Sequence, residues 1–188
     1  MIRIGFSLVS KINKTFAIFL LILPLFCGNS VYAGDGFEAV RCGEDIVKAL
    51  RGRKGSQEPV VKIEERHKDI GLKDLGAEII SDDERLFLVF WQICGEEYLT
   101  LDYEGVIKDA LKFPKHSKET PQFDGFCELN GKELKEVVLA VLKREGSAAK
   151  FHALQAWKID EKQKKFVPLS TDGLLCGPDG ISSEDSAQ

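Results

Sequence analysis

The segment LFLVFWQIC, residues 86–94, is apolar on both faces if it forms a β-strand. Alternate side chains of a strand point to opposite faces, so Phe87 and Val89 share one face while Leu86 and Leu88 share the other. An antiparallel strand with one wet face alternates apolar and polar residues instead. We therefore predict that this segment is a central strand with neither face in water.

Several parts of the chain can cover the two faces of this strand. The main core covers one face, and the other is covered by a predicted helix at 44–51, by a second sheet, or by residues 134–145 if these are helical. Two alternatives are an apolar ligand pocket inside a barrel, lined by Phe87 and Trp91, and a dimer face.

The first 33 residues have the pattern of a secretory signal peptide. MIRIGFSLVSKINK carries three basic residues and no acid, and an apolar run follows it. We place the cleavage after Ala33, so that the mature chain begins at Gly34. Pro24 interrupts the apolar run, which is then shorter than the roughly 20 residues of a membrane-spanning helix. A lipid-modified Cys27 is a weaker alternative, because a bulky residue precedes it. The prediction is an exported protein, periplasmic or secreted, with no transmembrane segment after signal cleavage.

The net charge of the mature chain indicates its partners, and its length indicates the number of domains. Removal of residues 1–33 takes away three of the 26 basic residues and none of the 30 acidic ones, so the formal net charge changes from −4 to −7. Proteins that bind nucleic acid or anionic membranes have basic surfaces, so neither is expected as a partner. We predict a single disulfide-tied β-rich domain at 34–176 and a disordered acidic tail at 177–188.

Four cysteines remain after signal cleavage: Cys42, Cys94, Cys127 and Cys176. An even number of cysteines in an exported chain predicts two disulfides. A CxxC pair is typical of zinc sites and of redox centres, and the widely spaced cysteines of this chain contain no such pair. Three pairings are possible. We favour Cys42 with Cys176, which would join the ends of the domain, and Cys94 with Cys127, which would join neighbouring strands.

Turn signals divide the rest of the mature chain into hairpins. Residues 134–145 are ambiguous, because their apolar positions match a helical stripe, whereas their β-branched residues and the preceding Asn130-Gly131 turn favour a strand. We predict a strand there. The other predicted elements are the helix at 44–51, a strand at 60–67 with Val61 and Ile63 inward, hairpins at 77–94 and 98–111, and a last hairpin within 151–170.

The fold class that follows from these elements is mainly β (α+β). We expect an antiparallel meander of about eight strands that forms a sandwich or barrel, with one short N-terminal helix.

No motif in the sequence identifies an enzyme. GxSxG and HExxH are absent, and His67, His116 and His152 lie far apart. Disulfide pairing of all four mature cysteines leaves no thiolate nucleophile. Two sets of neighbouring acids, Asp82 to Glu84 and Asp160 with Glu161, fall in predicted turns, where carboxylates are normally solvated. The sequence therefore predicts no catalytic, cofactor-binding or metal-binding residue, and no cofactor.

The segment EERHKDIGLKD, residues 64–74, is the best candidate for a binding surface. A strand is predicted to run out here into a loop that is dense in charges of both signs, and binding residues often lie on such loops. The candidate partner surface consists of Arg66, His67, Lys68 and Asp69. The competing interpretation is an ordinary solvated surface.

Five segments of the mature chain, RCGEDIVKALRG, ERHKDIGLKDLG, WQICGEEY, ELNGKEL and AWKIDEKQKKFV, resemble segments of small exported bacterial proteins of uncharacterised function. The resemblance extends over nearly the whole mature chain. It implies no activity and no site.

The sequence thus favours an exported, non-enzymatic domain that binds an unknown protein or envelope partner, with an inhibitor as one form of this function. A small carrier of an apolar ligand in a β-barrel cavity is the first alternative, and an unrecognised hydrolase is the second. An enclosed apolar cavity would favour the carrier, and an exposed aromatic patch on a solid core would favour the binding domain. A cleft that holds His67 or His116 beside an acid would favour the hydrolase. The sequence does not specify an oligomeric state.

Overall fold

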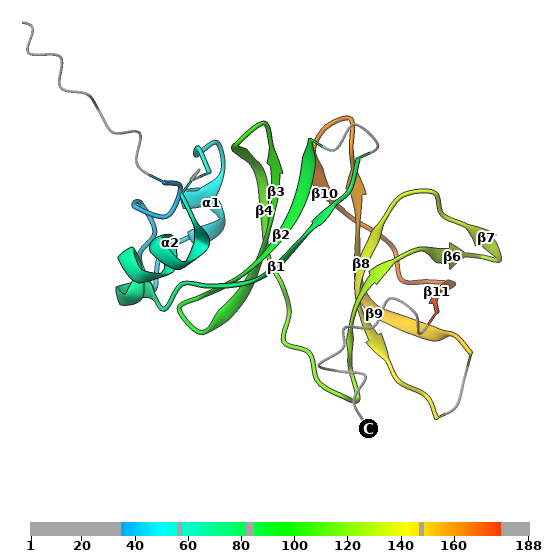
Figure 1. Cartoon of the computed structure of the whole chain (residues 1–188). Helices are drawn as coiled ribbons and strands as arrows, with labels where there is room; N and C mark the ends of the chain where they lie inside the picture. Colours follow the sequence, from blue (N-terminus) through cyan, green and yellow to red (C-terminus); the bar gives the residue numbers. More distant parts are fainter. Residues whose placement is uncertain (1–34, 56–57, 82–84, 147–148, 178–188) are drawn as a thin grey trace, which may run out of the picture. The chain divides into compact units, whose positions relative to one another are not determined.

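Antiparallel strands make up most of the structure, a computed structural model that describes residues 35–55, 58–81, 85–146 and 149–177 (Figure 1). All these residues belong to one of two units of the chain, the one that spans residues 33–188. Eleven strands form two sheets, accompanied by two short α-helices and one turn of 3-10 helix. The prediction of a mainly β, antiparallel fold is confirmed. The predicted signal peptide with its cleavage site, and nearly all of the predicted acidic tail, lie outside the described residues.

The first sheet is a meander in which each strand pairs with the next one along the chain. Its order is β1 (Lys73–Ile79), β2 (Leu86–Ile93), β3 (Glu96–Tyr103) and β4 (Val106–Lys112). Two-residue turns join β2 to β3 and β3 to β4, and both residues of each turn have positive φ. This backbone conformation matches the right-handed twist of the strands that it connects. The predicted hairpins at 77–94 and 98–111 are confirmed.

Strand β2 lies inside the first sheet and is covered on both faces, as its sequence predicts. Leu88 and its neighbours on one face pack in an apolar core that also contains Leu139 of the second sheet. On the other face, Trp91 and Ile93 pack with the helices, against residues such as Leu50. The second sheet therefore covers one face of β2, and the helices cover the other. Phe87, near the start of the strand, is still 37% exposed, so this cover does not reach the whole second face.

The second sheet is not a simple meander. Its order is β5 (Gln122–Gly125), β8 (Val138–Lys143), β9 (Phe151–Asp160), β11 (Leu174–Cys176), β6 (Cys127–Leu129) and β7 (Lys132–Glu133), and β10 (Lys165–Pro168) also pairs with β9. Strand β8 confirms that the ambiguous segment at 134–145 contains a strand and no helix. The Asn130-Gly131 turn joins β6 to β7 as predicted, with positive φ at both residues. Strands β6, β7 and β11 have two or three residues each, which explains why the structure contains more than the eight or so strands that we predicted.

The two sheets share the apolar core around Leu88 and Leu139, and a polar contact joins them beside it. Asp109 of β4 is buried, and its Oδ2 accepts a hydrogen bond from the backbone N–H of Phe166 in β10 at 3.0 Å. Its Oδ1 accepts a hydrogen bond from Arg51 Nε at 2.6 Å. Strands β4 and β10 are thus held together on this side of the shared core.

The helix α1 (Ile46–Leu50) confirms the prediction for 44–51, but the predicted strand at 60–67 is wrong. Those residues form the helix α2 (Val60–Arg66), followed by the 3-10 turn η1 (Lys68–Ile70). Ile63, His67 and Ile70 are buried, which is the i, i+4, i+7 spacing of a helical face. Val61, which a strand would have turned inward beside Ile63, is 72% exposed. None of the described helices is long and apolar enough to cross a membrane.

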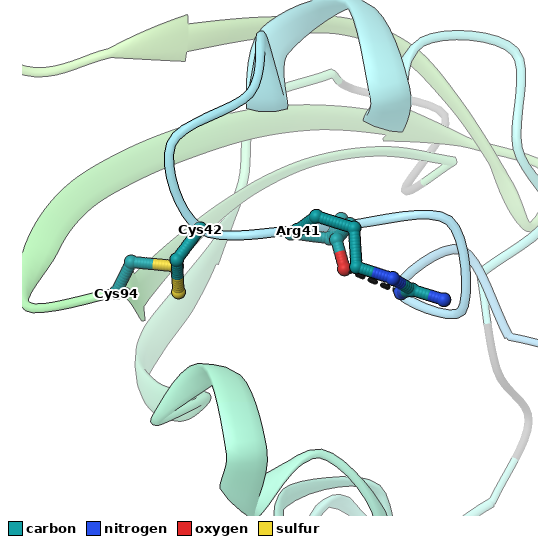
Figure 2. Close-up of a disulfide and its surroundings, with 4 residues drawn as sticks. Arg41, Cys42 and Cys94 are labelled. Carbon is teal, nitrogen blue, oxygen red and sulfur yellow. Dashed lines mark hydrogen bonds between the residues drawn. A yellow bond between two sulfur atoms is a disulfide. The ribbon is translucent and has the colours of Figure 1, made fainter.

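The four cysteines of the described residues form two disulfides, but the pairing that we favoured is wrong. Cys42 bonds Cys94, and Cys127 bonds Cys176. The first disulfide ties the segment before α1 to the turn after β2, and Figure 2 shows Arg41 beside it, with its side chain folded back onto the backbone. The second joins residues that stand directly opposite each other in β11 and β6. The second bridge is therefore local to the second sheet, and the first joins the first sheet to the segment before α1. Two disulfides are typical of proteins in a non-reducing, extracellular environment.

Candidate functional site

The four residues of the predicted partner surface do not have a common environment. Arg66, Lys68 and Asp69 are exposed, while His67 between them is only 7% exposed. Lys68 lies 3.4 Å from Glu65 in an exposed ion pair. An exposed pair of this kind contributes little to stability. Lys68 and Asp69 are accessible because both are exposed. A partner surface in this region stays a prediction, but its histidine belongs to the interior.

His67 and Arg66 both bind the buried carboxylate of Asp35. His67 Nε2 lies 2.6 Å from Asp35 Oδ1, and Arg66 Nη1 lies 2.6 Å from Asp35 Oδ2. The backbone N–H of Phe37 also donates to Oδ1, at 3.2 Å. Both oxygens of a carboxylate whose side chain is 1% exposed are thus occupied. This arrangement anchors the first described residues to the end of α2.

His116, in contrast, lies in a pocket beside an acid. Its Nε2 is 2.9 Å from Glu97 Oε2. The pocket has a volume of about 290 Å³ and is lined by Leu75, Gln92, Gly95, Glu96, Glu97, Phe113, Pro114, Lys115 and His116. This lining contains no serine, threonine or cysteine, so a hydrolase site here would need His116 to activate a water molecule. The charged residues of the lining also distinguish the pocket from the apolar cavity expected of a lipid carrier.

Leu75 belongs to β1, an edge strand of the first sheet. Within the described residues β1 pairs only with β2, and six of its seven residues are exposed. The backbone N–H of Ile80, the next residue, donates to Leu86 O at 2.9 Å. Hydrogen-bonded and non-hydrogen-bonded pairs alternate along an antiparallel ladder, so Glu78 bonds β2, and the backbone groups of Ala77 and Ile79 point away from it.

The first half of the same edge is already occupied. The N–H of Asp74 donates to Glu64 Oε1 of α2 at 2.8 Å, and the N–H of Gly76 donates to Asp74 Oδ1 at 2.7 Å. A β-bulge lies between Asp74 and Gly76, and Gly76 has a φ of 134°. Bulges of this kind interrupt strand pairing at sheet edges. The open part of the β1 edge is therefore short, and we define it as Ala77–Ile79.

Two exposed apolar side chains lie beside the open edge. Ile79 is 56% exposed and stands directly opposite Phe87 of β2, which is 37% exposed. Residues directly opposite each other in an antiparallel pair share a face of the sheet, so the two side chains are neighbours. The open edge thus combines free backbone hydrogen-bonding groups with an aliphatic and an aromatic side chain.

The other face of the open edge carries a carboxylate. Glu78 stands opposite Leu88, so its side chain lies on the face that packs in the core shared by the two sheets. Asp124 of β5, the edge strand of the second sheet, stands opposite Leu139 of the same core. Within the described residues neither carboxylate has a hydrogen bond or an ion pair. Glu78 is exposed at its surface, but the part of it that is covered raises its pKa, and burial together with the charge of Glu78 raises the pKa of Asp124 to about 6.

No local sequence pattern marks Ala77, Glu78, Ile79 or Asp124 as candidate site residues. The apolar letters of AEIIS indicated a strand, but Glu78 looked like the polar residue of an alternating pattern. Its unusual environment arises because β1 and β5 are both edge strands, and strand order is not encoded in any local pattern. The chain matches no protein-family model, no curated protein and no solved structure.

Proposed function

We propose that the protein is an exported binding domain that takes up an extended segment of a protein partner along the open edge of β1. The observation that carries this proposal is the outward direction of the backbone groups of Ala77 and Ile79 beside the exposed pair Ile79 and Phe87. An edge strand with unpaired N–H and C=O groups is a template for another strand, and addition of a strand gives both hydrogen bonds and apolar contacts.

The energetics favour a modest, specific interaction. Ala77 and Ile79 together offer two N–H donors and two C=O acceptors, and each new hydrogen bond adds about 0.5 to 1.5 kcal/mol net. Apolar side chains of the added strand would also cover Ile79 and Phe87. Each Å² of apolar surface removed from water in this way adds about 25 cal/mol to the free energy of binding. β2 supports this edge, because one of its faces packs in the shared core and Trp91 and Ile93 on the other face pack with the helices.

Export is the second part of the proposal. The basic and apolar pattern of residues 1–33 and the two disulfides both support it. Amino-terminal sequencing of the protein recovered from outside the cytoplasm should give Gly34 as the first residue. An intact N-terminus on the functional protein would contradict this part of the proposal.

The binding function can be tested with one pair of variants at Ala77. Proline at this position removes an N–H that points away from β2, so the ladder within the first sheet keeps its bonds. The matched control, Ala77→Ser, keeps the N–H. Tagged forms of both variants and of the unmodified protein are used for affinity capture from the envelope fraction. We expect the captured protein to be lost with Ala77→Pro and retained with Ala77→Ser. Equal capture by all three forms would contradict binding at this edge.

The carrier and the hydrolase stay alternative predictions. The hydrolase has the pocket of His116 and Glu97 as its basis. Loss of a measured hydrolytic activity in His116→Ala, with Ala77→Pro unaffected, would favour it over strand binding.

A further inference from the structure

We infer that the partner segment presents a lysine or arginine directly opposite Glu78, with an apolar residue on each side of it. This inference rests on the proposed addition of a strand at Ala77–Ile79 and specifies the chemistry of that strand. It assigns the carboxylates of Glu78 and Asp124 a role as the counter-charge for one basic side chain.

The register of the added strand follows from the groups that are free. A strand that bonds to Ala77 and Ile79 places one of its residues opposite Glu78, and that residue points to the same face as Glu78. This face is the one that packs in the shared core, because Glu78 stands opposite Leu88. The two flanking residues point to the other face, where Ile79 and Phe87 are exposed. The pattern apolar, central, apolar is therefore fixed by the geometry of the edge.

Charge determines the central residue. The side chain opposite Glu78 would enter the region where Glu78 and Asp124 repel each other, and neither has a partner of opposite charge within the described residues. Burial raises both pKa values, and the charge of Glu78 raises that of Asp124 further, so a negative charge on Asp124 beside Glu78 is unfavourable. A lysine or arginine would offset both charges, an apolar residue would leave them unpaired, and a glutamate would add a third.

The same charges disfavour two occupants that belong to this protein. A second copy that pairs antiparallel with Ala77–Ile79 through its own Ala77–Ile79 places Glu78 opposite Glu78, and like charges in directly opposite positions are destabilising. The end of the chain, PDGISSEDSAQ at 178–188, contains three acids and neither lysine nor arginine. A different chain with a basic strand is the occupant that fits, and the net negative charge of the mature protein would also attract it.

The test uses the protein purified after export and three acetylated, amidated peptides, TVKVT, TVQVT and TVEVT. Chemical shifts of the backbone amides of ¹⁵N-labelled protein report both the location and the affinity of binding. We expect changes at the β1 edge, with TVKVT bound about tenfold more tightly than TVEVT, which corresponds to about 1.4 kcal/mol. In the double variant Glu78→Gln with Asp124→Asn we expect this ratio to fall to about one, while TVQVT still binds. This double variant removes repulsion, so it should fold at least as well as the unmodified protein.

The outcomes separate the inference from the proposed function. Binding of all three peptides at the β1 edge with equal affinity would overturn the basic strand and leave strand addition in place. A lysine preference that persists in the double variant would also overturn it, because other residues would then supply the counter-charge. Peptide shifts that lie elsewhere, that are unchanged in Ala77→Pro, or that do not occur for any peptide would overturn strand addition itself.

Discussion

Replacement of Asp124 by asparagine should make the protein more stable at neutral pH and have little effect in acid. Asparagine has nearly the same size and shape as aspartate and carries no charge. Asp124 is half-buried, has no hydrogen bond or ion pair within the described residues, and lies near the carboxylate of Glu78. The substitution therefore removes a charge that the folded protein holds at a cost.

The size and pH dependence of the effect follow from the raised pKa. A pKa raised from 3.8 to about 6 disfavours the charged carboxyl by about 3 kcal/mol in the folded state. Solvent screens part of this cost because the side chain is only half-buried, so we expect about 1 to 2 kcal/mol. The folded protein keeps its proton between about pH 4 and 6, where the unfolded chain has lost it. Stability therefore falls as the pH rises through this window, and the cost is complete above it.

Urea unfolding at pH 3.5 and at pH 7.5 measures the prediction. Asp124→Asn should raise the free energy of unfolding at pH 7.5 by about 1 to 2 kcal/mol and leave it nearly unchanged at pH 3.5. Asp172→Asn, which removes a charge from an exposed position, controls for the change in net charge. Glu78→Gln should reduce the gain from Asp124→Asn, because part of the repulsion is already gone. A gain of equal size at both pH values, or a loss of stability at pH 7.5, would refute the reasoning.

Three further predictions concern stability. Leu88→Ala should lower the free energy of unfolding, measured in urea, by about 2 to 5 kcal/mol. Phe87→Ala should lower it clearly less, because part of the Phe87 ring is already in water. Equal losses would show that both faces of β2 are equally buried. Replacement of both Cys127 and Cys176 by serine should lower the free energy of unfolding by up to about 4 kcal/mol, the chain-entropy limit for a loop of this length. Peptide mapping of the unmodified protein under non-reducing conditions should recover these two cysteines linked to each other. His67→Ala should lower the free energy of unfolding by about 1 to 3 kcal/mol in thermal or urea unfolding, because the buried Oδ1 of Asp35 loses a hydrogen-bond partner. An unchanged free energy of unfolding would mean that His67 is not needed to hold Asp35.

The sequence predicted the parts of the fold that depend on local patterns. LFLVFWQIC is long and apolar at every position but one, so its burial on two faces follows whatever its neighbours are. The Asn130-Gly131 turn depends on two residues that accept positive φ, and it was predicted for the same reason. At Val60–Arg66, two apolar residues in alternate positions suggested a strand, but the buried face extends over Ile70 and is helical.

Local sequence patterns did not predict the disulfide pairing or the candidate site. Cysteine pairing depends on which strands are neighbours, and β11 lies beside β6 in the sheet although β8 and β9 come between them in the sequence. The open edge depends on strand order in the same way. Glu78 occurs in an ordinary strand pattern, and only the placement of β1 and β5 at the ends of their sheets brings its carboxylate near Asp124.

The two local disulfides determine how far the chain can be stretched when its ends are pulled apart. Each bridge closes a loop, with sequence separations of 52 and 49 between the bonded cysteines, and removes that loop from the length that can extend. Between the bridges only the span from Cys94 to Cys127 can lengthen, by at most about 110 Å at roughly 3.4 Å per residue. Under tension β3, β4 and β5 would be pulled out, while β1 and β2 stay within one covalent ring and β8, β9 and β11 within the other. A protein of this construction would yield a short, limited extension and keep its binding edge inside a closed loop.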